Sequence, residues 1–279
     1  MLLSQGKPRI KVVTFDLWET LLFERDGASG RRSAARCRDV AEAFNRLGVN
    51  VSTERTESAL KQVIASLLEV WDRNEDVSHV EQLELLVRFV SNGSFALKNE
   101  WVEDLSSAYV SAFFEVPPYL NPDAVSVLED LVEAGKQIGL ICNTGLIPGF
   151  ALRRFLESEG VLEYFDLLVF SDEMGFRKPD SRFFDFAARK LKADPSSVVY
   201  VGDNLRIDVW GAKNAGFKAI HFACDEGRDK MAEADPNSLV ARSRRLGTLE
   251  KERIAPDKTI TSFTMVTEAV KQLEERTYI

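Results

Sequence analysis

Several side chains suited to acid–base or metal chemistry follow short apolar runs of the sequence. Asp16, Asn143 and Asp203 each stand at the end of such a run, Asp208 lies in the segment after Asp203, and Lys178 lies beyond a fourth run. In open α/β sheets, ligands bind beyond the carboxyl ends of the strands, so we expect these groups in one crevice. Neighbouring carboxylates repel one another unless a cation or a proton intervenes, and a hard ion such as Mg²⁺ suits them. Lys178 would steady an anionic substrate or balance Asp16.

Small polar groups complete the predicted crevice. Cys142 and Thr144 flank Asn143, and Asn204 follows Asp203 directly. Backbone amides at the helix starts near Gly145 and Asn204 would supply further donors to an anion. A buried cysteine is more often a small packing residue than a nucleophile, so we assign Cys142 no covalent role.

Alternating strand and helix patterns would position these side chains. The apolar runs are rich in β-branched residues, which suits buried parallel strands, and the segments between them suit helices on the two faces of a sheet. The predicted strands are Lys11–Leu17, Ile138–Cys142, Leu167–Phe170, Val198–Val201 and Ala219–Phe222. The predicted helices are Pro122–Ala134, Pro148–Ser158, Ser181–Leu191 and Leu205–Ala215. Residues 225–257 are expected to be irregular surface, and Ile260–Phe263 with a helix at Thr264–Glu275 would close the domain.

A long helical region interrupts this succession after the first strand. Its apolar residues recur at spacings of three and four, and Ser78 with Glu81 forms a capping box. The predicted helices of this region are Arg31–Leu47, Leu60–Trp71, Ser78–Gly93 and Asn99–Phe114. We therefore predict an α/β fold, a three-layer Rossmann-like parallel-sheet core of residues 1–24 and 117–279, with an inserted all-α helical cap of residues 25–116.

Composition and charge exclude several classes of protein. The 279 residues carry 36 Lys and Arg against 44 Asp and Glu, a net charge of −8, which argues against binding to nucleic acid or to an anionic membrane. No signal peptide or membrane-spanning run is present, and the 3 cysteines suit reduced thiols, so a cytoplasmic protein is expected. A cluster of arginines is interpreted as a solvated helix face, with contact to an anionic substrate as the alternative; its members are Arg31, Arg32, Arg36 and Arg38.

The order of these residues resembles a known family. The segment from Phe15 to Leu22, then Asn143, then Lys178-Pro179-Asp180, then Gly202-Asp203 with Asp208 look like the four motifs of the haloacid dehalogenase-like (HAD) hydrolase superfamily. The resemblance covers the whole chain. The helical insertion lies between the first two motifs, where that family places its cap.

The resemblance implies a role for each matching residue. Asp16 would be the nucleophile that forms a covalent aspartyl intermediate, and Lys178 would neutralise it and the substrate oxygens. Asp203, Asp16 and the main-chain carbonyl of Trp18 would bind Mg²⁺, with Asp208 as an outer carboxylate. Asn143 and its backbone would cradle the anion, with Cys142, Thr144 and Asn204 beside it.

Two departures from the family pattern bear on the reaction. Phosphatases of the family usually have an aspartate two residues after the nucleophile as general acid and base, and here that residue is Trp18. The loss of such a group typically costs about 10²–10⁴ in rate. Dehalogenases of the family also lack it, but they resemble metal-free enzymes without an acid at the position of Asp203. Cys142 takes the usual Ser or Thr place of the second motif.

Three functions follow, in order of preference. The first is a Mg²⁺-dependent phosphatase of small phosphorylated metabolites with an aspartyl-phosphate at Asp16, slow or restricted to good leaving groups. The second is a 2-haloacid dehalogenase-type hydrolase in which Asp16 displaces halide from carbon. The third is a catalytically weak scaffold that binds a ligand or a protein. The sequence indicates neither the individual substrate nor the oligomeric state.

Overall fold

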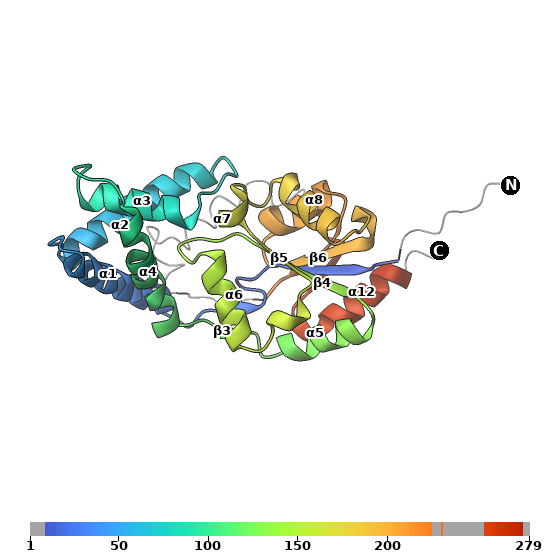
Figure 1. Cartoon of the computed structure of the whole chain (residues 1–279). Helices are drawn as coiled ribbons and strands as arrows, with labels where there is room; N and C mark the ends of the chain where they lie inside the picture. Colours follow the sequence, from blue (N-terminus) through green and yellow to red (C-terminus); the bar gives the residue numbers. More distant parts are fainter. Residues whose placement is uncertain (1–8, 225–229, 231–253, 276–279) are drawn as a thin grey trace.

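The computed structural model describes residues 9–224, 230 and 254–275, and these build a central parallel sheet (Figure 1). In the described part of the chain the sheet has 6 strands in the order β5-β4-β1-β6-β7-β8. The strands are β1 Val12–Phe15, β4 Gln137–Cys142, β5 Leu167–Phe170, β6 Val198–Gly202, β7 Lys218–Phe222 and β8 Lys258–Ile260. Phe15 of β1 is paired with Leu140 on one side and Val201 on the other, so the residue after β1 emerges at the middle of the sheet.

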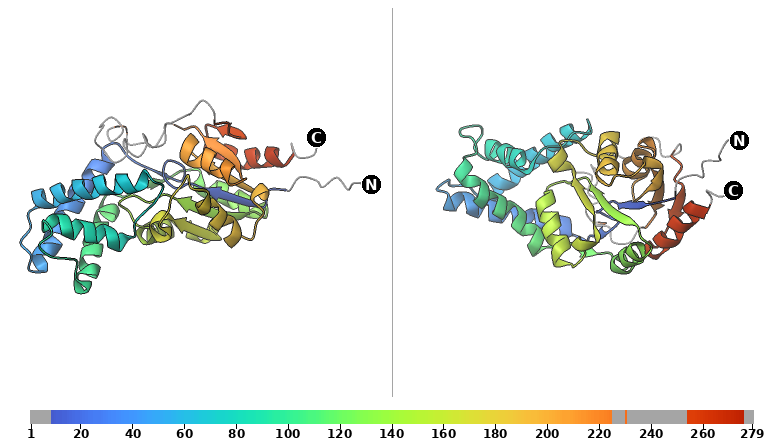
Figure 2. Two further views of the ribbon diagram at one scale, coloured as in Figure 1. Left: turned by 90° about the horizontal axis from the view of Figure 1, so that it is seen from above. Right: turned by 45° about the vertical axis from the view of Figure 1, so that its right-hand side comes forward.

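Helices cover both faces of this sheet, because side chains of a strand alternate between its faces. Figure 2 shows helices on both sides of the sheet. Val13 and Phe15 belong to one apolar cluster with residues of α5, α6 and α12, whereas Val12 belongs to a second cluster with residues of α8 and α9. These helices are α5 Ala124–Glu133, α6 Gly149–Ser158, α8 Ser181–Lys190, α9 Gly211–Asn214 and α12 Val266–Glu275. The predicted three-layer α/β core is confirmed.

Between β1 and β4 in the sequence, a group of helices lies together at one end of the molecule (Figure 1). They are α1 Ala28–Arg46, α2 Thr53–Trp71, α3 His79–Val90 and α4 Val102–Glu115. The capping box predicted at Ser78 and Glu81 is present at the start of α3. Leu60, Leu83 and Leu105, from three of the helices, are buried in one apolar cluster. We refer to this group of helices and their connecting loops as the cap.

The arginine cluster of α1 does not form the expected solvated face. Arg32 and Arg36 are buried, whereas Arg31 and Arg38 are exposed as predicted. Arg32 pairs with Glu24 at 2.6 Å, and Arg36 stacks on the ring of Tyr109 at 4.8 Å. The prediction was wrong for these two residues because long-range partners let α1 bury guanidinium groups.

Both chain crossings between core and cap pass through a small ribbon that the sequence did not indicate. Strand β2, Leu22–Phe23, pairs in antiparallel fashion with β3, Tyr119–Leu120. Asn121 also links the two chain segments, because its side-chain Nδ2 donates to the carbonyl of Thr20 at 3.0 Å. Strands of two residues carry no periodicity, which is why only their pairing reveals them.

The predicted helix Leu205–Ala215 has two parts. Leu205–Trp210 is π-helical, and α9 continues it. The carbonyl of Asn204 accepts from the amides of both Asp208 and Val209, which widens the first turn. Most of the predicted irregular segment 225–257 lies outside the described residues. No helix within the described ranges combines the length and the apolar character needed to cross a bilayer.

Candidate active site

Three charged side chains meet at the carboxyl ends of β1 and β6. The ammonium of Lys178 lies 2.7 Å from Oδ1 of Asp16 and 2.7 Å from Oδ1 of Asp208. Asp208 and Lys178 are buried, and Asp16 is 8% exposed. Asp16 follows β1 in the middle of the sheet, and its Oδ1 also accepts the amide of Leu17 at 2.7 Å. The structure therefore brings together Asp16 and Lys178, as the sequence predicted, while the role of Asp16 as a nucleophile stays a prediction.

Tyr200 completes this arrangement, and the sequence analysis did not find it. Its phenolic oxygen accepts from the Lys178 ammonium at 2.6 Å and lies 3.1 Å from both the Ile141 carbonyl and Oδ1 of Asp208. An ammonium has three donors, and here all three are used. Burial, followed by the charge of Asp208, raises the pKa of Tyr200 well above its ordinary value. The one sequence signal is a single polar ring in the otherwise aliphatic run of β6.

The environment changes the acidity of the two central groups. Burial, followed by the negative charge of Asp208, raises the pKa of Asp16 to about 7, although Lys178 opposes this. Burial lowers the pKa of Lys178, but the carboxylates of Asp16 and Asp208 outweigh it and raise that pKa above its ordinary value. These shifts favour the charged form of Lys178, and further positive charge beside Asp16 would favour its carboxylate form near neutral pH.

A third carboxylate makes the site suitable for a metal ion. Asp16, Asp203 and Asp208 each offer a carboxylate oxygen, and these atoms all lie within 4.8 Å of one another. Gly202 permits this approach, because a Cβ atom there would lie 2.6 Å from the Asp208 side chain. Oxygen donors at this spacing fit a hard divalent cation such as Mg²⁺. The sequence analysis predicted that these same three aspartates would lie together.

Asn143 acts on the backbone of the Lys178 loop. Its Nδ2 donates to the Lys178 carbonyl at 2.9 Å, and its Oδ1 accepts from the Lys178 amide at 2.8 Å. These two hydrogen bonds hold the loop after β4 against the loop that carries Lys178. The predicted contact of Asn143 with substrate stays a prediction.

Asn204 has a similar local task. Its side chain accepts from the amides of Arg206 and Ile207 and so caps the π-helical turn, while its own amide donates to Oδ2 of Asp208 at 3.0 Å. Asn204 therefore fixes the outer oxygen of Asp208, and its predicted substrate contact remains untested.

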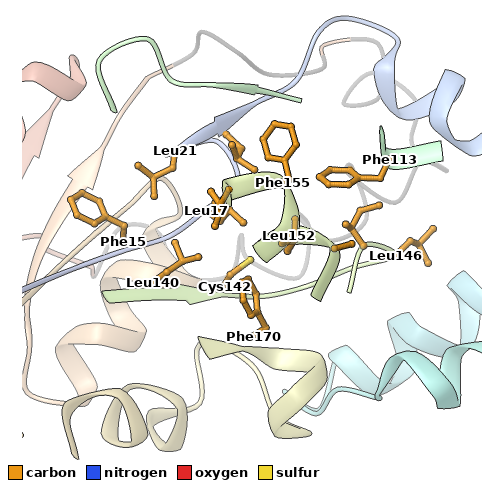
Figure 3. Close-up of a cluster of buried hydrophobic side chains, with 14 of the residues drawn as sticks. Phe15, Leu17, Leu21, Phe113, Leu140, Cys142, Leu146, Leu152, Phe155 and Phe170 are labelled. Carbon is orange, nitrogen blue, oxygen red and sulfur yellow. The ribbon is translucent and has the colours of Figure 1, made fainter. Parts of the chain in front are cut away.

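Cys142 and Thr144 are both buried. Figure 3 shows Cys142 among apolar side chains that include Leu152 and Phe170, and burial raises the pKa of its thiol well above the ordinary value. The hydroxyl of Thr144 lies 3.1 Å from that of Ser171, and it accepts from the Asp172 amide at 3.2 Å. Both side chains thus have partners inside the protein.

Trp18 joins the core to the cap. Its half-buried ring makes an edge contact with Phe113 of α4, with the ring centroids 6.4 Å apart. The side chain that replaces the acid of the family pattern is therefore part of an aromatic wall. A second contact joins the cap to the loop after β4, because Nε2 of Gln82 donates to the Gly145 carbonyl at 3.2 Å.

A cleft of about 50 Å³ opens beside Lys178. Its core side includes Asn143, Arg177 and Arg206. Its cap side is formed by Trp71 at the end of α2 and by Asp72 and Asn74 of the turn that follows. Three basic residues line this cleft against one acidic residue, Asp72. Asp16 and Asp208 pair with Lys178, and Asp76 pairs with Arg177, so the lining is polar and largely charge-compensated and suits a small polar group between core and cap.

Comparison with known proteins gives one consistent result. The family model "haloacid dehalogenase-like hydrolase" matches residues 10–216. The chain is 37% identical over 131 residues to a ribulose-1,5-bisphosphate 5-phosphatase of Halopiger xanaduensis, a match that spans 47% of this chain and about half (53%) of that relative. It is 27% identical to a glyceraldehyde 3-phosphate phosphatase of Methanopyrus kandleri over 87% of this chain and 98% of the relative.

A solved structure shares the fold. The crystal structure of a 2-haloacid dehalogenase from Pseudomonas syringae has a TM-score of 0.63 and 23% identity, and the match covers 94% of this chain and 99% of that one. At this identity the likeness concerns the arrangement of core and cap helices alone.

Proposed function

Because this chain belongs to the haloacid dehalogenase-like hydrolase family, we propose that it is a Mg²⁺-dependent phosphatase of small phosphorylated metabolites. The observation that carries the proposal is the cluster of Asp16, Asp203 and Asp208, whose oxygens lie within 4.8 Å of one another beside Lys178. Three carboxylates with one lysine leave an excess of negative charge, which a divalent cation would balance. The names of the two relatives, which both specify sugar phosphates, support a small phosphorylated substrate.

Asp16 is the nucleophile of the proposed reaction. Both hydrogen bonds that its carboxylate accepts from described residues fall on Oδ1, so we assign the attack on phosphorus to Oδ2. An Oδ2–P bond forms as the bond from phosphorus to the leaving oxygen breaks, and water then hydrolyses the aspartyl-phosphate. Lys178 keeps its proton throughout and offsets the charge that gathers on Asp16 and the phosphoryl oxygens.

The residues present fit a resident Mg²⁺. Asp16, Asp203 and the main-chain carbonyl of Trp18 would hold it, with Asp208 as an outer carboxylate, and when bound it would supply positive charge that stabilises the phosphoryl oxygens. It would also favour the carboxylate form of Asp16, whose pKa burial raises to about 7. The leaving group would take its proton from water, since the side chain of Trp18 cannot act as a general acid.

The cleft beside Lys178 suits a small polar substrate. Its volume of about 50 Å³ has room for a compact polar group, and the polar side chains of Asn143 and Arg206 form part of its core wall. We assign this space to the organic part of the substrate, held between the core and the turn after α2.

One observation favours a second candidate, a 2-haloacid dehalogenase-type reaction. Trp18 packs on Phe113 as an apolar wall, which suits a halogenated carbon better than a water-assisted acid–base step. The retained Asp203 favours the phosphatase. A catalytically weak scaffold that binds a ligand or a protein is the third outcome.

A panel of substrates separates the three candidates. Phosphate esters, including p-nitrophenyl phosphate, and 2-haloacids are tested with Mg²⁺ and with chelator, using the wild type and Asp16→Asn. Metal-dependent ester hydrolysis that the variant lacks supports the phosphatase. Chelator-resistant halide release supports the dehalogenase, and no turnover of either class supports the scaffold.

A further inference from the structure

The buried carboxylate of Asp76 lies in the cap, yet it bonds to two residues of the core segment that leads to Lys178. Asp76 belongs to the loop between α2 and α3, and its side chain is 0% exposed. Within the cap, its Oδ1 accepts from the indole of Trp71 at 2.9 Å and from the amide of Val77 at 2.9 Å. From the core, its Oδ2 accepts from the hydroxyl of Ser171 and from the guanidinium of Arg177 at 3.3 Å.

The backbone reinforces this junction. The amide of Asp76 donates to the Gly175 carbonyl at 3.1 Å, and the amide of Arg177 donates to the Asn74 carbonyl at 3.1 Å. Figure 1 shows the segment of the core involved, α7 Ser171–Met174, facing α2 and α3 of the cap. The cap is therefore docked on the chain immediately before Lys178.

Arg177 connects Asp76 to the lysine loop. Its side chain is 10% exposed and lies over the ring of Trp71 at 4.2 Å, so the carboxylate of Asp76 compensates a charge that has little access to water. A buried guanidinium that loses its carboxylate is strongly unfavourable and must move or draw in water. Because Arg177 and Lys178 are consecutive, such a movement changes the backbone from which the Lys178 ammonium reaches Asp16.

Ser171 connects Asp76 to the loop after β4. A carboxylate only accepts, so the Ser171 hydroxyl gives its one proton to Asp76 and must itself accept from Thr144. Its oxygen lies 2.8 Å from the Thr144 amide and 3.1 Å from the Thr144 hydroxyl. The charge of Asp76 thus sets the orientation of two hydroxyl groups and of the backbone next to Asn143, which clamps Lys178.

We propose that Asp76 is a positioning residue that holds the Lys178 loop and the Asn143–Thr144 loop in register from the cap. The catalytic part of this proposal rests on the proposed function. In this docked arrangement Asp76 is the shared acceptor of Ser171 and Arg177, and it thereby ties the position of the cap to the positions of both loops.

The variant Asp76→Asn tests the proposal, because it keeps the size of the side chain and removes the charge. We expect kcat for p-nitrophenyl phosphate to fall about 10- to 100-fold per folded molecule while KM changes far less, since misplacing a reacting group by about 1 Å can cost about 10² in rate. Arg177→Met should lose a similar factor. The double variant should be no worse than the poorer single one, because both changes break one contact.

Glu75→Gln is the matched control. It removes the same charge from the adjacent residue, whose side chain is 52% exposed and pairs with Arg73 at the surface. We expect its kcat to equal that of the wild type within about twofold. The proposal would be overturned if kcat of Asp76→Asn equals that of the wild type. It would also be overturned if the reductions in kcat of the two single variants multiply in the double variant.

Hydrogen exchange tests the same proposal without activity. In Asp76→Asn, the amides of Thr144 and Lys178 should exchange at least about tenfold faster, whereas those of β6 should keep their protection. If exchange in both loops is unchanged, the proposal for Asp76 is contradicted. If the wild type hydrolyses no ester, only the proposed phosphatase function is overturned, and the exchange measurement still tests the role of Asp76. If Asp76→Asn does not fold, Ser171→Ala and Arg177→Lys test the two branches separately by the same two measurements.

Discussion

The ammonium of Lys178 and the phenolic oxygen of Tyr200 lie 2.6 Å apart, and both groups contact Oδ1 of Asp208. The Lys178 ammonium thus donates two hydrogen bonds to the carboxylates of Asp16 and Asp208 and the third to the neutral side chain of Tyr200. Tyr200 directs the ammonium without adding to the negative charge of the site. Four groups of the site therefore share one set of hydrogen bonds.

Tyr200→Phe should weaken both stability and catalysis. The Ile141 carbonyl loses a buried donor and Lys178 loses an acceptor, which would cost about 1–3 kcal/mol in the free energy of unfolding. A less constrained Lys178 should lower kcat about tenfold. Chemical denaturation and ester hydrolysis measure the two effects. Tyr164→Phe, which removes a surface hydroxyl bonded to Glu129, is the control, and an equal effect of both variants would contradict this role of Tyr200.

Trp18→Asp should restore the general acid that the family pattern contains. For alkyl phosphates, whose leaving groups need a proton, we expect kcat to rise by about 10²–10⁴, and for p-nitrophenyl phosphate much less. The lost contact with Phe113 should lower stability by about 1–3 kcal/mol. Trp18→Phe keeps an aromatic ring and should not change the ratio of alkyl to aryl turnover. A ratio that stays constant in Trp18→Asp would show that residue 18 forms only a wall of the site.

Magnesium should stabilise the protein more at high pH than at low pH. Because the pKa of Asp16 is raised to about 7, its contribution to the stability of the metal-free protein is fully present below the unfolded value of 3.8 and is lost as the pH rises through 7. Mg²⁺ must displace that proton near pH 6 but not near pH 8, so its apparent affinity should be about tenfold weaker at the lower pH. This corresponds to a difference of about 2–4 °C in the shift of Tm. Thermal unfolding with and without Mg²⁺ measures it, and a shift that persists in Asp203→Asn would place the ion elsewhere.

Cys142 should resist alkylation in the folded protein. Its thiol is buried, and burial raises its pKa well above the ordinary value, so little reactive thiolate is present. Cys224 is half-buried and should react with iodoacetamide first. Mass spectrometry of the labelled protein, with activity measured in parallel, is expected to show label on Cys224 and unchanged kcat. Labelling of Cys142 together with loss of activity would show that the thiol reaches the substrate.

The order of elements and the central charged residues could be predicted from the sequence. The strands are apolar runs that stand out locally, and Asp16, Lys178, Asp203 and Asp208 each follow one of them, so the rule that parallel strands share a carboxyl edge brings them together. Predicting their convergence required no knowledge of side-chain contacts.

Residues whose role depends on distant partners could not be predicted in this way. Asp76 meets Ser171 and Arg177 across 95 and 101 positions of sequence, and no local pattern marks an aspartate in a turn as buried. From its charge alone Arg36 would be predicted at the surface of α1, but the ring of Tyr109 from α4 packs against its guanidinium. Tyr200 fits its strand by hydrophobicity alone, and only the position of Lys178 gives its hydroxyl a function.

The ribbon of β2 and β3 has a consequence for the modularity of the molecule. Phe23 and Tyr119 are cross-strand partners, so the ends of the inserted segment leave the core side by side. A two-residue Asn-Gly turn from Phe23 to Tyr119 would close an ordinary β-hairpin in place of residues 24–118. A chimera joined at this pair of residues should therefore keep the strands that precede Asp16 and Asp203, but its new cap would have to supply the contacts that Asp76 makes with Ser171 and Arg177.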